Sequence, residues 1–124
     1  MNKRPLLYLL LFTSLILIYQ DKAIAQSGKT ITPDKAIDSL FHIAEVKARV
    51  KYVKDKSKGK RDLSAIIFNE NNNESLYYEI GIVEDNGAAY HTHFTFRVNR
   101  KTFAIQVLDI VEDKWLTLSQ WRKK

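Results

Sequence analysis

The sequence of 124 residues contains no cysteine. This absence excludes a disulfide framework, catalysis by a thiol and any cysteine-ligated zinc site. It also excludes the lipid attachment of a lipoprotein, which needs a cysteine at the cleavage position. A small exported domain without disulfides has to be held together by its apolar core alone.

Sequence patterns for common enzyme chemistries are also missing. There is no glycine-rich phosphate loop, no nucleophile elbow and no His-Glu-x-x-His motif. The serines Ser64, Ser75 and Ser119 have no neighbouring group that would activate them, and no pair of carboxylates forms an evident acid/base couple. The sequence therefore predicts a protein that is not an enzyme and that carries no cofactor.

No apolar run reaches the roughly 20 residues that a membrane-spanning helix needs. The longest, Leu6–Tyr19, has 14 positions. It follows the basic Asn2-Lys3-Arg4 and precedes the small residues Ala23-Ile24-Ala25, which is the order of a secretory signal peptide. We predict that residues 1–25 are a signal peptide cleaved near Ala25, with a retained membrane anchor as the alternative.

Export without disulfides is more typical of the bacterial periplasm or cell surface than of eukaryotic secretion. We therefore expect a periplasmic or secreted bacterial protein with no membrane span after cleavage. The remaining 99 residues suffice for one domain and carry 17 basic and 13 acidic residues. This mild excess identifies no partner, and the export signal together with the lack of a binding motif argues against nucleic acid.

Hydrophobic periodicity predicts one long helix followed by an antiparallel meander. Residues 26–32 read as a flexible tail. Thr32-Pro33-Asp34 is typical of a helix start, and apolar residues at helical spacing continue towards Gly59, before which the helix should end. Period-two alternation then indicates strands at Leu63–Phe68, Leu76–Val83, Ala89–Val98 and Thr102–Ile110, with Trp115–Trp121 as a short strand or a helical turn.

The fold class predicted for residues 33–124 is therefore α+β, in a single domain. One long N-terminal helix should pack on one face of a four- to five-stranded antiparallel meander sheet, and the other face should meet water.

The stretch His91-Thr92-His93 invites a metal-binding interpretation. Strict alternation places both histidines on the solvent face of their strand, about 6.6 Å apart, because the aromatic residues of the other face should cover the helix. Structural zinc needs four protein ligands and catalytic zinc three, so another ligand is required. Glu79 on the neighbouring strand is the candidate.

The predicted hairpin register does not bring that ligand into place. Counting outward from an Asn86-Gly87 turn pairs Glu79 with Phe94 rather than His93, and a one-residue bulge would be needed to change this. Arg97 on the same face would also repel a cation. Two interpretations remain: a metal site using His91 and His93, or a solvent-exposed binding surface. The residues of that surface are His91, His93, Thr95, Arg97 and Glu79.

A basic segment covers residues 47–61, with eight cations in fifteen positions. It would suit anionic glycans, lipopolysaccharide phosphates or an acidic protein, while the alternative is a solvated helix end followed by a loop. The candidate residues are Lys47, Arg49, Lys51, Lys54, Lys58, Lys60 and Arg61. Among the large aromatics Trp115, Trp121, Tyr77 and Tyr90, we expect Trp121 to pack back over the sheet.

Residues 76–110 resemble PepSY-type domains, which are small extracytoplasmic modules. The likeness rests on Tyr78-Glu79-Ile80, on Thr95–Asn99 and on the frame Val98–Ile105. That frame follows the family's Val-Asp-x-x-Thr-Gly-x-Ile hairpin, with Asn99 in place of aspartate and Phe103 in place of glycine. One helix on such a meander is also similar to the cystatin-like fold, although no Gln-x-Val-x-Gly inhibitor loop is present. The PepSY resemblance implies a peptidase-regulating or protein-binding unit.

The leading hypothesis is an exported, non-catalytic binding or inhibitory module for a protein or peptide partner. One alternative is a periplasmic metal-binding protein that uses His91 and His93. Another is an envelope-associated domain that docks on an anionic envelope component through the basic segment 47–61.

Overall fold

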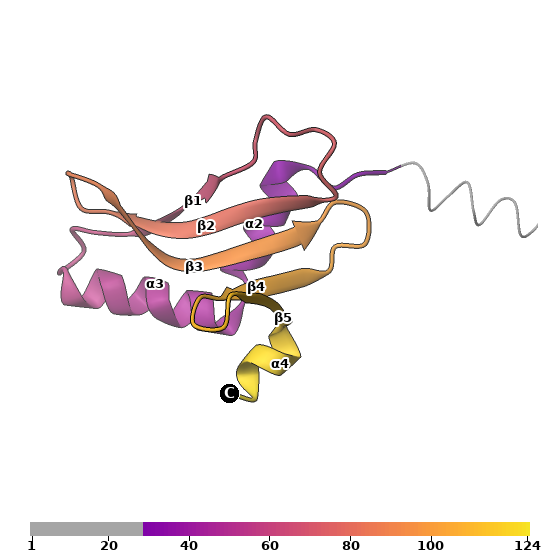
Figure 1. Ribbon diagram of the computed structural model, residues 1–124. Coiled ribbons are helices and arrows are strands. Elements are labelled where there is room, and N and C mark those ends of the chain that lie inside the picture. Colours follow the sequence, from indigo (N-terminus) through magenta and orange to yellow (C-terminus); the bar gives the residue numbers. More distant parts are fainter. Residues whose placement is uncertain (1–28) are drawn as a thin grey trace, which may run out of the picture. The chain divides into compact units, whose positions relative to one another are not determined.

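The computed structural model describes residues 29–124, so the predicted signal peptide and residues 26–28 of the predicted tail lie outside the described residues. The strands are antiparallel throughout and lie in chain order, and the α+β class with an antiparallel sheet is confirmed (Figure 1). The elements are α2 (Pro33–Phe41), α3 (Ala44–Lys56), β1 (Leu63–Ile67), β2 (Tyr77–Asp85), β3 (Tyr90–Asn99), β4 (Ile105–Asp109), β5 (Lys114–Thr117) and α4 (Leu118–Arg122). No helix formed by residues 29–124 is long and apolar enough to cross a membrane.

The single long helix predicted from residue 33 onward is wrong, because the helical region consists of two helices. His42 closes α2, and Ile43 takes an extended conformation, with φ −67° and ψ 132°, as the N-cap of α3. The apolar pattern changes from one helical stripe to another at this point. Leu40 of the first stripe and Val46 of the second are both fully buried. The break lets both stripes face the same core, which one straight helix would not.

The start of α2 lies where the sequence predicts it. The Thr32 hydroxyl accepts a hydrogen bond from the Lys35 backbone N–H at 3.3 Å, and Pro33 occupies the first helical position. The preceding residue, Ile31, is tied to two other parts of the fold. Its N–H donates to the Arg100 carbonyl at 2.7 Å, and its carbonyl accepts from the Tyr78 hydroxyl at 2.8 Å. Ile31 is therefore held by hydrogen bonds, although the sequence placed it in a flexible tail over residues 26–32.

The core lies between the helices and one face of the sheet. Its strand residues lie directly opposite one another on neighbouring strands and therefore share one face of the sheet. Ile80 pairs with Phe96, and Phe96 pairs with Val107. We call this the helix-bearing face and the opposite one the open face. The core residues are Ala36, Leu40, Ile43, Val46, Val53, Leu63, Ile80, Ile82, Phe96, Val98, Val107 and Leu116.

The turn between β3 and β4 is fixed by Asn99 and Phe103. The Asn99 side chain is largely buried, and its Oδ1 accepts hydrogen bonds from the backbone N–H groups of Lys101 and Thr102, both at 2.9 Å. Phe103 has φ +68°, in the left-handed region that glycine adopts freely. It stands at the glycine position of the PepSY frame. Because this turn occupies residues 100–104, β4 begins at Ile105 rather than at Thr102 as predicted.

Replacing Asn99 should test this turn. We expect Asn99→Ala to lower the free energy of unfolding by about 1–2 kcal/mol, because two backbone N–H groups lose their acceptor. Asn99→Asp keeps an acceptor oxygen and should retain most of the stability. Urea denaturation followed by circular dichroism measures both variants. Equal losses for the two would contradict the role assigned to the oxygen.

Candidate functional site

The β2–β3 hairpin contains a β-bulge within the histidine stretch. Ile82 pairs with Phe94, whereas Val83 pairs with Thr92, so His93 is an extra residue on β3. One extra residue inverts the in–out alternation of all residues beyond it. The bulge therefore decides which face of the sheet the histidines occupy.

Beyond the bulge, Glu84 pairs with His91 on one side and with Leu63 on the other. Leu63 belongs to the core, and directly opposed residues share a face, so Glu84 and His91 lie on the helix-bearing face. Thr95 and Arg97, on the other side of the bulge, point to the open face. The prediction that the histidines share the solvent face with Thr95 and Arg97 is wrong, because it assumed unbroken alternation.

Glu84 is the centre of a charged cluster at this end of the sheet. Its side chain is only 8 % exposed; Oε2 lies 2.8 Å from His93 Nε2, and Oε1 lies 2.5 Å from Arg61 Nη1. His93 is similarly buried, and its ring meets that of His91 edge-on, with 4.9 Å between centroids. The hydrogen bond with His93, supported by the charge of Arg61, lowers the pKa of Glu84 although burial opposes this. Glu84 is therefore ionised at neutral pH.

Among the described residues, no third ligand is placed to form a metal site with His91 and His93. Glu79, the predicted candidate, lies opposite Arg97 on the open face, away from both histidines. His93 Nε2 is instead engaged by the Glu84 carboxylate. In the described part of the chain, no three histidine, aspartate or glutamate side chains are grouped so that they could hold a metal ion. The geometry thus gives His91 and His93 no support as the basis of a metal site.

Arg97 is the centre of an aromatic cluster on the open face. Its guanidinium carbon lies 4.3 Å from the ring centroid of Tyr77 and 4.7 Å from that of Trp115, and its Nε donates to Gln106 Oε1 at 2.6 Å. Among residues 29–124, Glu79 forms no ion pair with Arg97, although the two are directly opposed. The open face retains three residues of the predicted binding surface: Glu79, Thr95 and Arg97.

The basic residues of segment 47–61 do not act as one uniform patch. Lys51 lies 2.9 Å from Asp55, and Lys54 lies 3.2 Å from Asp62. Arg61 contacts Glu84, as described above. The two exposed lysine pairs contribute little stability, but all three contacts reduce the positive charge that an anionic partner would meet. The other predicted members of the patch are exposed: Lys47, Arg49, Lys58 and Lys60.

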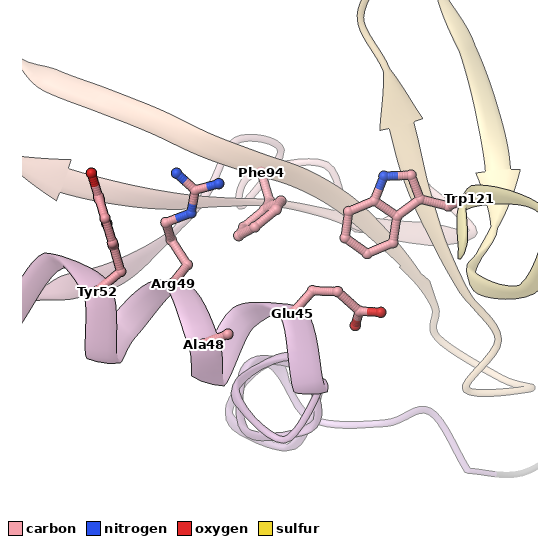
Figure 2. Close-up of a pocket in the computed structure, with 6 residues that line it drawn as sticks. All are labelled: Glu45, Ala48, Arg49, Tyr52, Phe94 and Trp121. Atoms are coloured by element: carbon pink, nitrogen blue, oxygen red, sulfur yellow. The ribbon is translucent and has the colours of Figure 1, made fainter. Parts of the chain in front are cut away.

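A groove that the sequence did not predict lies between α3 and β3, and we call it the α3–β3 groove. Its volume is about 480 Å³. Figure 2 shows four residues of α3 along one wall, with Phe94 and Trp121 across from them. The α3 residues follow the spacing i, i+3, i+4, i+7 of a single helix face. The lining residues are Glu45, Ala48, Arg49, Tyr52, Phe94 and Trp121.

The wall of the groove combines a cation with aromatic rings. The Arg49 guanidinium carbon lies 5.8 Å from the ring centroid of Tyr52 and 5.7 Å from that of Phe94. Trp121 packs edge-on against Phe94, with 5.8 Å between centroids and an interplanar angle of 82°. Trp121 therefore packs back over the sheet, as predicted. Tyr52 is 55 % exposed, which leaves an aromatic side chain at the groove open to solvent.

An ion pair fixes the two sides of the groove relative to each other. Arg122 Nε donates to Glu45 Oε1 at 2.6 Å, and Nη2 donates to Oε2 at 3.1 Å. This two-point contact lowers the pKa of Glu45 and joins α4, which carries Trp121, to α3. Arg49, one turn further along α3, has no carboxylate partner among residues 29–124. The groove therefore presents one positive charge that the described chain does not neutralise.

No protein-family model matches this chain, and no curated protein or solved structure matches it. The resemblance to PepSY-type domains and to the cystatin-like fold stays a prediction. Function is therefore inferred from the three surfaces described above: the α3–β3 groove, the open face and the Glu84 cluster.

The lowered pKa of Glu84 predicts a loss of stability in acid. A carboxyl whose pKa is lower in the folded than in the unfolded chain stabilises the fold above its unfolded pKa, and this contribution disappears as the pH falls through the folded value. We expect Glu84→Gln to be less stable than the wild type at pH 7. We expect the difference to shrink as the pH falls below the ordinary glutamate value of 4.5.

Urea denaturation from pH 7 down to about pH 3 measures this difference. Glu79→Gln, on the open face and exposed, is the matched control and should follow the wild type over the whole range. A constant offset between Glu84→Gln and the wild type at all pH values would contradict the assigned ion pairing.

Proposed function

We propose that this chain is an exported, non-catalytic binding or inhibitory module that holds a protein or peptide partner in the α3–β3 groove. Export rests on the signal-peptide pattern of residues 1–25. The observation that carries the proposal is the chemistry of the groove. Tryptophan, tyrosine and arginine are the residue types that most often dominate binding energy at protein interfaces. Trp121, Tyr52 and Arg49 bring all three types together in one groove.

The Trp121 anchor is positioned before any partner binds. Trp121 rests on Phe94 and on Phe96, whose ring centroid is 6.3 Å away, and the Glu45–Arg122 pair holds its helix against α3. Side chains that are already ordered lose less conformational entropy when a partner docks on them. The arrangement therefore favours binding over a purely structural use of the same residues.

The groove is a better candidate than the open face. On the open face, Arg97 already donates to Gln106 and lies close to the rings of Tyr77 and Trp115, which leaves less of it to recognise a ligand. Arg49 is exposed, at longer distances from its two rings, and has no carboxylate partner in the described chain. A partner that brings a carboxylate next to an apolar side chain would complement both Arg49 and the rings of Phe94 and Trp121.

Two arginine variants test this assignment as a matched pair. Octapeptides selected on the purified chain from a random display library should bind Arg49→Ala at least tenfold more weakly than the wild type. Arg97→Ala also removes an arginine that lies over two rings, but on the other face, and should change the Kd by less than about twofold. Isothermal titration calorimetry gives the affinities, and circular dichroism checks that both variants fold.

Two results would contradict the proposal. Selected peptides that are sensitive to Arg97→Ala but not to Arg49→Ala would assign binding to the open face instead. A selection that yields no peptide with a Kd better than about 1 mM would show that the groove is not a peptide-binding surface.

A further inference from the structure

Strand β3 is paired along its whole length on one side but only partly on the other. Its pairing with β2 runs from Asn99 back to Tyr90. Its pairing with β4 covers only residues 96–98. Residues 90–95 therefore have no strand partner on the β4 side within residues 29–124. Such an edge offers backbone N–H and C=O groups to another strand.

The edge opens because the β4–β5 hairpin leaves β3 at this point. β4 and β5 stay paired with each other as far as Asp109 and Lys114, whereas the pairing of β4 with β3 ends at Val107. A cleft of about 420 Å³ lies here, and we call it the β3–β4 cleft. It is lined by residues 92–95 of β3 together with Val107, Leu108, Ile110 and Trp121.

The composition of this edge suits pairing. Natural edge strands are commonly protected by lysine, proline or inward-pointing charges. Residues 90–95 contain no lysine, proline or acidic residue and consist of tyrosine, histidine, threonine and phenylalanine, several of which favour strands. In the lining of the cleft, Ile110 is 82 % exposed and offers apolar surface. The bulge at His93 restricts regular pairing to a short run.

The cleft and the α3–β3 groove adjoin each other, since Phe94 and Trp121 line both. Side chains of a strand added at the β3 edge would alternate between the two faces of the sheet. Those on the helix-bearing face would meet the two aromatic rings and, two residues along, Arg49. The β3 edge in the cleft would thus pair with the backbone of the added strand, and the groove residues would contact its side chains.

We infer that the partner held by this chain is an extended segment that adds to the edge of β3 as a short strand. On one face this segment carries an apolar side chain for Phe94 and Trp121, and a carboxylate two residues away for Arg49. Strand addition of this kind obtains affinity from main-chain hydrogen bonds and specificity from alternate side chains. The inference rests on the proposed function and specifies the conformation and chemistry of the partner.

Two N-methylated versions of one peptide distinguish binding by strand addition from binding by side chains alone. The probe is acetyl-Thr-Phe-Thr-Glu-Thr-Val-Thr-amide, which as a strand places Phe, Glu and Val on one face. Because alternate N–H groups of a strand point to opposite sides, one version is N-methylated at Phe, Glu and Val, and the other at the threonines between them. We expect one version to bind the purified chain at least tenfold more weakly than the parent, and the other within about twofold.

Hydrogen exchange measured by NMR provides a second readout that needs no variant of the protein. Bound parent peptide should slow the exchange of backbone amides within residues 92–95 that face the cleft. Replacing the peptide's Glu by Lys should weaken binding at least tenfold, because it would bring a second cation to Arg49.

Several results would overturn this inference while leaving the groove as a binding surface. Equal effects of the two methylated versions would show docking without strand pairing. Failure of the parent peptide to bind, while library-selected peptides bind through Arg49, would refute the assigned side-chain pattern. Protection of amides 92–95 in a dimer without peptide would assign the edge to a second copy of the chain.

Discussion

The bulge at His93 is the feature on which the rest of the hairpin depends. Without the extra residue, His93 would lie on the open face, and Glu84 would lose the hydrogen-bond partner that lies 2.8 Å from it. A carboxylate as buried as Glu84 is costly unless it is paired and hydrogen-bonded. The bulge therefore supplies one of the two partners of this carboxylate on the helix-bearing face, and Arg61 is the other.

The same irregularity separates the buried part of β3 from its exposed part. Towards Asn99, β3 is a central strand, and Phe96 and Val98 are fully buried in the core. Past the bulge, towards Tyr90, it pairs with β2 alone and its side chains become exposed. Bulges bend a strand and increase its twist, and they occur often beside functional sites. The α3–β3 groove and the β3–β4 cleft meet at Phe94, next to the extra residue.

Regular periodicity was sufficient to predict the antiparallel meander, which follows from burying alternate apolar residues. The packing of Trp121 over the sheet was predicted from its large aromatic side chain instead. Periodicity failed where the register changes. The sequence alternation continues from Phe96 and Phe94 to Thr92 on the other side of the bulge, so nothing in the pattern marks the inserted residue. The two apolar stripes of the helical region also fit a bent helix, and only the extended conformation of Ile43 shows the break. Glu45 and Arg49 could not be recognised as groove residues, because charged residues on a helix usually indicate a solvated face.

An open strand edge can pair with a second copy of the same chain. The charge of Arg49 near the β3 edge affects which partner can pair there. Two copies pairing symmetrically at residues 90–95 would bring two identical grooves together, each with an Arg49 that no carboxylate of the described chain neutralises. Like charges brought together oppose association, whereas a segment with a carboxylate removes the repulsion and adds an attraction. The bulge also limits the length over which two flat edges could pair. Together these features favour a short acidic strand from another protein over a second copy of this chain.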